Sequence, residues 1–106
     1  MSEEYNIEFG RRAINDLRNI YYYIRFTLGA SDSATKIVEG ILNAANSLSF
    51  MPKRFAVLEG ALWNGKEIRK FTVKHFVVCY SVDDDSKKVA ILRVTHAKRD
   101  YSALLM

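Results

Sequence analysis

The chain has 106 residues, of which 49% are apolar and 26% are charged, so we expect residues 1–106 to form one domain with a real core. This composition argues against a disordered chain, and the sequence has no run of about 18 apolar residues that would predict a transmembrane helix. The net charge is +4 but uneven: residues 1–52 hold five Lys and Arg against six Asp and Glu, whereas residues 53–106 hold eleven against six. We therefore expect a positively charged surface in the second half, which suits a polyanion or an acidic protein partner.

The residues predict neither a metal site nor a cofactor. Cys79 is the single cysteine, so we expect no internal disulfide and no cysteine metal cluster. The acidic run at residues 83–85 lacks the ligand spacing of a calcium-binding loop and is better explained as a hairpin turn. The lone cysteine, and a Met-Ser-Glu-Glu start without a basic and apolar signal segment, fit a cytoplasmic protein with no membrane partner.

The first elements predicted in chain order are a short strand and a long helix. Alternating apolar residues predict the strand over residues 5–9, and Gly10 ends it. Apolar residues then recur at helical spacing, which predicts a helix over about residues 11–28. Gly29 is a suitable C-terminal stop for this helix.

A second helix follows after a short turn. Ser31 or Ser33 can cap its start, and its apolar stripe continues to Leu48 before Pro52 closes it. Gly40 weakens this helix by roughly 1 kcal/mol relative to alanine, or lets it pack closely on its neighbour. Because the connection is short, we expect the two helices to form an antiparallel hairpin.

The remaining elements predict a small sheet. Residues 53–64 resemble a loop, and strands are predicted at about 66–73, 75–82 and 88–95, with a hairpin turn at 83–86. The middle strand is apolar on both faces and is therefore expected at the centre. The order β-α-α-β-β-β predicts an α+β fold with an antiparallel-dominated sheet. The helix hairpin should cover one face, because so small a sheet cannot bury its apolar side alone.

Several patterns along the chain carry a resemblance to a known family. They are Ala13-x-x-Asp16-Leu17-x-x-Ile20-x-x-Tyr23-Ile24, Leu48-x-x-x-Pro52, Ile68-Arg69-Lys70-Phe71-x-Val73, Phe76-Val77-Val78-x-Tyr80-x-Val82, and Ile91-Leu92-Arg93-Val94-x-His96-x-x-Arg99-Asp100 followed by Leu104-Leu105. In this order and spacing they resemble the RelE/ParE superfamily of toxins from bacterial type II toxin–antitoxin modules. The last pattern resembles the close of the ParE branch in particular. The resemblance implies the same fold, and a cognate antitoxin that forms a hetero-oligomer with the toxin.

The two branches of this superfamily act differently. RelE-like members cut mRNA in the ribosomal A site with basic groups, whereas ParE-like members trap DNA gyrase on cleaved DNA. In RelE-like sequences an arginine usually follows the aromatic that opens the third strand, and here that position is Val77. Tyr101 and Leu105 stand near the places of a further arginine and an aromatic. The resemblance therefore favours a gyrase inhibitor that causes growth arrest and plasmid stabilization and is not an enzyme. The alternatives are a ribosome-dependent mRNA endoribonuclease and a degenerate module that only binds antitoxins.

If the chain is a nuclease, its site needs a base, an acid and a cation near one phosphate. The candidates for these roles are His96, His75, Lys70, Lys74, Arg69, Arg99 and Tyr101. Both histidines titrate near neutral pH, but they lie on different predicted strands and the sequence does not show them converging. His96 can instead hold the last strand to the tail, and His75 can be a solvated sheet residue.

If the chain only docks onto a target, the basic rim of the sheet and the last residues are the predicted contact. The candidates are Arg69, Lys70, Lys74, Lys98, Arg99 and Tyr101, although the first three also fit a solvated strand face. The antitoxin would lay an amphipathic, acidic segment over the helix hairpin or the sheet face.

One arginine and several aromatic residues lead to further expectations. Arg93 is expected to pair with Glu67 or Asp100, because a half-buried arginine needs a carboxylate. The run at residues 21–23 is tyrosine throughout, and helical geometry predicts that only one of the three is free of the core. Trp63 is the more exposed aromatic candidate for a contact.

Overall fold

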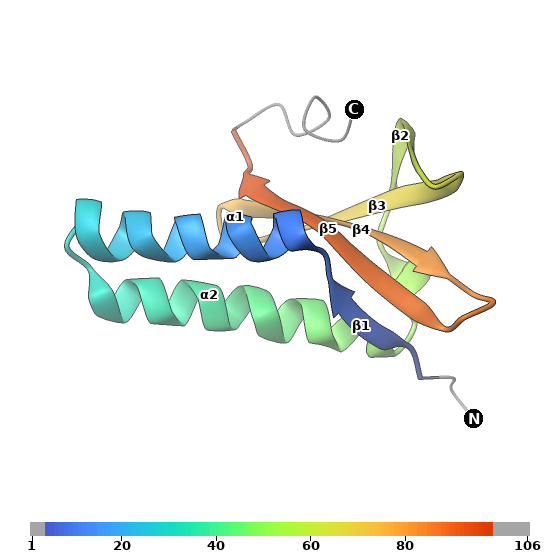
Figure 1. The fold of residues 1–106 in the computed structure, drawn as a ribbon, viewed down its shortest axis with the longest axis horizontal. Helices are drawn as coiled ribbons and strands as arrows, with labels where there is room; N and C mark the ends of the chain where they lie inside the picture. The colour runs from blue at the N-terminus through green and yellow to red at the C-terminus, as the bar shows by residue number, and fades with distance from the viewer. Residues whose placement is uncertain (1–3, 99–106) are drawn as a thin grey trace.

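The structure is a computed structural model that describes residues 4–98 (Figure 1). Its elements are β1 (Asn6–Phe9), α1 (Arg11–Tyr22), a π-helical turn (Tyr23–Thr27), α2 (Ser31–Asn46), two 3-10 turns (Ser47–Ser49 and Pro52–Arg54), β2 (Val57–Trp63), β3 (Lys66–Val73), β4 (Phe76–Asp83) and β5 (Lys88–His96). The two helices run antiparallel and cover one side of the sheet (Figure 1). Neither is long and apolar enough, within the described residues, to cross a membrane.

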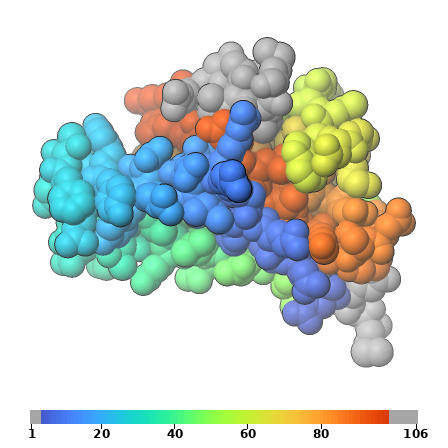
Figure 2. Space-filling view, in the orientation of Figure 1, coloured from blue at the N-terminus to red at the C-terminus, as the bar shows by residue number. Residues whose placement is uncertain are grey.

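The five strands form one sheet in the order β1-β5-β4-β3-β2. β1 runs parallel to β5 and every other pair is antiparallel, which confirms the antiparallel-dominated α+β fold. β4 lies at the centre, as its two apolar faces predicted. In the space-filling view, the start of α1 and the β2–β3 hairpin stand on either side of β5 (Figure 2).

The interpretation of residues 53–64 as a loop was wrong, because β2 lies within them. Its pattern is weak since Gly60, at φ 80°, coincides with a shift of register between Val57 and Leu62. Asn64 and Gly65 have φ values of 50° and 76°, which is the positive-φ pair that a tight two-residue hairpin requires. This Asn-Gly pair was the signal in the sequence that a strand precedes β3.

The helices differ from expectation in their details. The first helix continues through the π-helical turn and ends at Gly29, which has a left-handed φ of 67°. The second begins at Ser31, but the cap residue is Ala30 and no serine side chain within residues 4–98 caps it. A Cβ added to Gly40 would meet no described heavy atom within 4 Å, so close packing does not explain this glycine.

The core is divided between the two faces of the sheet. The larger cluster lies under the helices and consists of Ala13, Leu17, Ile41, Ala45, Leu48, Phe71, Val78, Tyr80, Val89, Ile91 and Val94. The smaller cluster lies on the outer sheet face, which the helices do not cover, and consists of Ile68, Val77, Cys79 and Leu92. Buried Tyr80 donates to the carbonyl of Pro52 at 2.6 Å, and burial raises its pKa to about 12.

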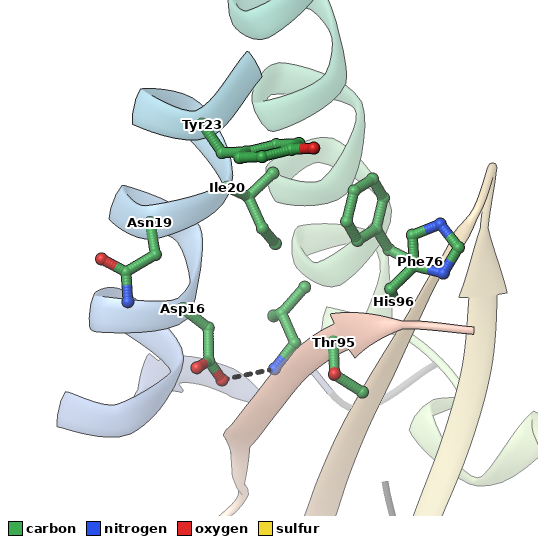
Figure 3. A pocket seen from close by; sticks show the side chains of 8 residues that line it. Asp16, Asn19, Ile20, Tyr23, Phe76, Thr95 and His96 are labelled. Atoms are coloured by element: carbon green, nitrogen blue, oxygen red, sulfur yellow. Dashed lines mark hydrogen bonds between the residues drawn. The ribbon is translucent and has the colours of Figure 1, made fainter. Parts of the chain in front are cut away.

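One carboxylate joins α1 to the exposed edge of β5. β1 pairs with β5 only as far as Ile91, so the amide of Val94 points away from the sheet. Asp16 accepts this N–H at 2.9 Å, and it also accepts Nε and Nη2 of Arg93 at 2.8 and 3.0 Å (Figure 3 draws the bond to Val94). The side chains of Asp16 and Arg93 are only 15% and 17% exposed. Hydrogen bonding to Asp16 raises the pKa of Arg93.

Asp16 is not the partner expected for Arg93. Glu67 lies 3.9 Å from Arg69 instead, and Asp100 is outside the described residues. Asp16 and Arg93 are 77 positions apart in the chain, so only the fold brings them together.

Replacing Gly40 with alanine should stabilise the fold. The new methyl group meets open space, and the unfolded chain loses backbone freedom, so the free energy of unfolding should rise by about 0.5–1 kcal/mol in urea denaturation. Gly29→Ala is the matched control and should lower that free energy, because its left-handed φ disfavours a side chain. A Gly40→Ala variant that unfolds at lower urea concentration than the parent chain would contradict this expectation.

Replacing Asp16 should destabilise the fold more than its position on a helix surface suggests. Asp16→Ala removes the acceptor of two Arg93 nitrogens and of the Val94 amide and should cost about 2–3 kcal/mol of unfolding free energy. Asp16→Asn keeps an acceptor oxygen and should cost less. Exposed Asp32, in the first turn of α2, is the control, and its replacement by alanine should cost below about 1 kcal/mol. Equal losses in the alanine variants of Asp16 and Asp32 would show that the edge contact contributes little.

Candidate functional site

The candidate catalytic histidines do meet in space. His75 precedes β4 and His96 ends β5, and their rings lie nearly parallel with centroids 6.3 Å apart. The ring of His96 also meets the edge of Phe76 at 5.6 Å. We call His75 and His96 the histidine pair. The antiparallel pairing of β4 with β5 produces this contact, which no sequence spacing could reveal.

His96 has a structural contact of its own. Its Nδ1 accepts the amide of Lys98 at 3.2 Å, and the amide of Ala97 donates to the carbonyl of His75 at 2.8 Å. These bonds hold the chain that follows β5 against the β3–β4 turn. They agree with the alternative role in which His96 holds the last strand to the tail.

His96 also borders a cavity of about 230 Å³ between α1 and the end of β5, which we call the α1–β5 cavity (Figure 3). Its lining residues are Asp16, Asn19, Ile20, Tyr23, Phe76, Val94, Thr95 and His96. The carboxylate of Asp16 is already hydrogen-bonded to β5, so it is held in place and is not free to move. The cavity therefore has one fixed anionic group on its wall and an imidazole at its rim.

Lys70, the candidate cation, lies on the other side of the sheet. It aligns with Cys79, which belongs to the outer-face cluster, whereas His96 aligns with Phe76, which packs toward the helices. Cys79 follows Phe76 by three residues, so about 10 Å of strand also separates Lys70 from the histidine pair. The described residues thus place Lys70 and the imidazoles in different environments. Arg99 and Tyr101 lie outside those residues.

Cys79 lies between two cations on the outer face. Lys70 and Arg93 align with it from β3 and β5, but the thiol is fully buried. Burial raises the pKa of Cys79 to about 11, although both cations act to lower it. The thiol is therefore protonated near neutral pH and is a weak nucleophile.

The other predicted contact residues occupy different settings. Nη1 of Arg69 donates to the carbonyls of Lys53 and Phe55 at 3.1 and 2.7 Å, so this guanidinium fixes the segment before β2. Lys74 is exposed in the β3–β4 turn at φ 54°, and Lys98 is exposed after β5. These two lysines flank the histidine pair along the chain.

The helix hairpin carries a feature that the sequence reasoning missed. An apolar groove of about 420 Å³ runs between α1 and α2, and we call it the α1–α2 groove. Its lining residues are Phe9, Ile14, Leu17, Arg18, Tyr21, Tyr22, Val38 and Leu42. Tyr22 and Tyr23 are 50% and 56% exposed, so the expectation that only one tyrosine of the run is free was wrong. The signal was a second apolar stripe on α1, beside the stripe that faces the sheet.

Comparisons with known proteins agree with this fold. The family described as ParE toxin of type II toxin-antitoxin system, parDE, matches residues 7–101. A comparison with curated protein sequences finds no match. The chromosomal ParDE toxin–antitoxin system from P. aeruginosa is similar in structure, with a TM-score of 0.69 and 21% identity, over 90% of this chain and 98% of that chain.

Two RelE structures are also similar. The archaeal RelE–RelB complex from Pyrococcus horikoshii OT3 has a TM-score of 0.63 and 15% identity, over 91% of this chain and 98% of that chain. A mutant of the E. coli toxin RelE in the free state has a TM-score of 0.64 and 15% identity, over 96% of this chain and 93% of that chain. At such identities these likenesses establish the fold alone. Because the family match extends over most of the chain and the fold agrees with it, this chain belongs to the ParE toxins of type II toxin–antitoxin systems, within the RelE/ParE superfamily.

Proposed function

We propose that this toxin acts on DNA gyrase and breaks no bond itself. The observation that carries the proposal is the separation of Lys70 from His96, because the two align with residues of opposite sheet faces. Cutting RNA requires a base, an acid and a cation around one phosphate. The guanidiniums of Arg69 and Arg93 bind backbone carbonyls and Asp16, which leaves the exposed lysines Lys74 and Lys98 as the described cations that flank the histidine pair along the chain.

A docking role uses the same residues differently. The exposed lysines Lys74 and Lys98, and Lys70 on the outer face, are positive charges that would attract an acidic or DNA-bound partner. Arg69 acts indirectly, because its hydrogen bonds fix the segment that leads into β2. Arg99 and Tyr101 remain candidates for target contact in the part of the chain outside the described residues.

We further propose that a cognate antitoxin occupies the α1–α2 groove. The similar structures from P. aeruginosa and Pyrococcus horikoshii are of toxin–antitoxin systems, which supports such a partner here. The groove is apolar except for Arg18, and the ring of its lining residue Tyr22 lies 5.9 Å from that of Phe26, which is 67% exposed. An amphipathic helix fits this surface if it presents apolar residues one turn apart and an acidic residue toward Arg18.

A single charged substitution can test whether the antitoxin binds in the α1–α2 groove. Ile14 is 44% exposed there, so Ile14→Lys should fold, yet it would bury a cation against an apolar partner. We expect calorimetry to show binding of the antitoxin encoded beside this gene weakened at least about thirtyfold, or roughly 2 kcal/mol. Leu62→Lys is the matched control, because Leu62 is 65% exposed on β2 and outside the groove. Unchanged binding by Ile14→Lys would place the antitoxin elsewhere.

The target can be tested with two assays run side by side. The purified chain should inhibit DNA supercoiling by gyrase and produce linear DNA, and it should leave transcripts intact in a translating extract. The contact between His75 and His96, with Lys74 and Lys98 beside them along the chain, favours the ribonuclease alternative. That alternative predicts transcript cleavage that is abolished by His96→Ala and by Lys70→Ala. Cleavage of this kind, with supercoiling unaffected, would refute the gyrase proposal.

A further inference from the structure

A third cavity lies on the outer sheet face, away from both the groove and the histidine pair. It measures about 240 Å³, and its described lining residues are Gly10, Arg11, Arg12, Trp63, Leu92 and Arg93. We call it the arginine cavity. Three of these six residues carry guanidiniums, one carries an indole, and none is acidic.

Three distant parts of the chain build this cavity. Gly10 joins β1 to α1 and lies close to β5. Its amide donates to the carbonyl oxygen of Ile91 at 2.9 Å, and a Cβ added to Gly10 would lie 3.2 Å from that oxygen, so a larger residue would not fit as well here. Trp63 ends β2 beside the tight Asn-Gly turn, and its side chain is 42% exposed. The start of α1 and the β2–β3 hairpin thus form two walls beside β5 (Figure 2).

The three guanidiniums differ in setting, because one is paired with a carboxylate and two stand at the start of α1. Nε and Nη2 of Arg93 bind Asp16, which holds the guanidinium plane at the cavity wall. Arg11 and Arg12 stand in the first turn of α1, which contains no acidic residue. Cations at a helix N-terminus oppose the helix macrodipole, and an anion bound beside them would oppose it less than the cations alone do.

We propose that the arginine cavity binds one nucleotide of a single-stranded nucleic acid. The base lies against the face of Trp63, and the phosphate lies among Arg11, Arg12 and Arg93. An indole stacks on any base, and guanidinium groups pair with phosphate oxygens. The base must be unpaired, because the bases of a duplex already stack on one another and leave no face for the indole.

Size and chemistry favour this ligand over two others. The cavity is smaller than the roughly 300 Å³ at which small-molecule pockets begin, so it suits one unit of a strand that passes over the face. An acidic peptide would satisfy the arginines but would leave the indole without a flat partner. The site does not depend on which target the toxin has, since its residues are separate from the histidine pair and the α1–α2 groove.

The site carries its own reporter, because Trp63 is the only tryptophan in the chain. Titrating the full chain with a short oligothymidylate at low salt should quench tryptophan fluorescence to saturation, and added salt should weaken the binding. The same sequence annealed into a duplex, and polyglutamate, should quench much less. Unchanged fluorescence with the single strand, or equal quenching by duplex or polyglutamate, would overturn the proposal.

Substitutions inside and outside the arginine cavity distinguish binding at this cavity from general attraction of the oligonucleotide to positive charge. Arg11→Gln with Arg12→Gln should weaken binding of a fluorescent oligothymidylate at least about tenfold and lower the slope of log affinity against log salt by about 1.4. Arg25→Gln with Lys36→Gln removes the same charge from exposed positions outside the cavity and should change affinity less than about twofold. Trp63→Leu should weaken binding by about tenfold, as expected for loss of a stacked base. Equal losses for both double variants would overturn the proposal, as would full affinity in Trp63→Leu.

Discussion

The carboxylate of Asp16 joins the helical and sheet layers at the point where the sheet loses its neighbouring strand. β1 stops opposite Ile91, and beyond that residue α1 lies beside β5. By accepting the amide of Val94 and two nitrogens of Arg93, Asp16 sets the distance between α1 and β5. It also protects an edge that would otherwise offer free backbone groups to another chain. Every surface that includes α1 takes its position from this contact.

Three such surfaces use the same helix, because residues on a helix point outward at about 100° intervals. One side of α1 gives Ile14 and Tyr21 to the α1–α2 groove, and another gives Asn19 to the α1–β5 cavity. The first turn gives Arg11 and Arg12 to the arginine cavity. The three surfaces differ in chemistry: the α1–α2 groove is apolar, the α1–β5 cavity holds a fixed carboxylate, and the arginine cavity is lined by guanidiniums. A single helix thus lets a small toxin offer separate surfaces to separate partners.

The sequence predicted the features that depend on local periodicity, and it failed where distant residues meet. Strong patterns indicated both helices, β1 and β3 to β5, and the central position of β4 followed from its two apolar faces. β2 was not predicted, because Gly60 interrupts the alternation of apolar residues in this strand and coincides with a shift of its register against β3. The partner of Arg93 could not be predicted, since Asp16 reaches it only after α1 has crossed the edge of β5. The histidine contact and the arginine cavity likewise arise from strand pairing and not from spacing along the chain.

The separation of these surfaces constrains how an antitoxin could silence the toxin. A segment in the α1–α2 groove covers residues such as Ile14 and Tyr22, while Lys70 lies on the outer sheet face and the arginine cavity opens between the start of α1 and the β2–β3 hairpin. Such a segment blocks the outer face only if its chain continues around a sheet edge, or if an attached domain prevents approach. Bulk alone would be enough against the proposed target, gyrase, because it is large, but a short oligonucleotide could pass it. If an attached domain prevents approach, the toxin–antitoxin complex would lose the proposed gyrase inhibition and keep the proposed binding of single strands at the arginine cavity.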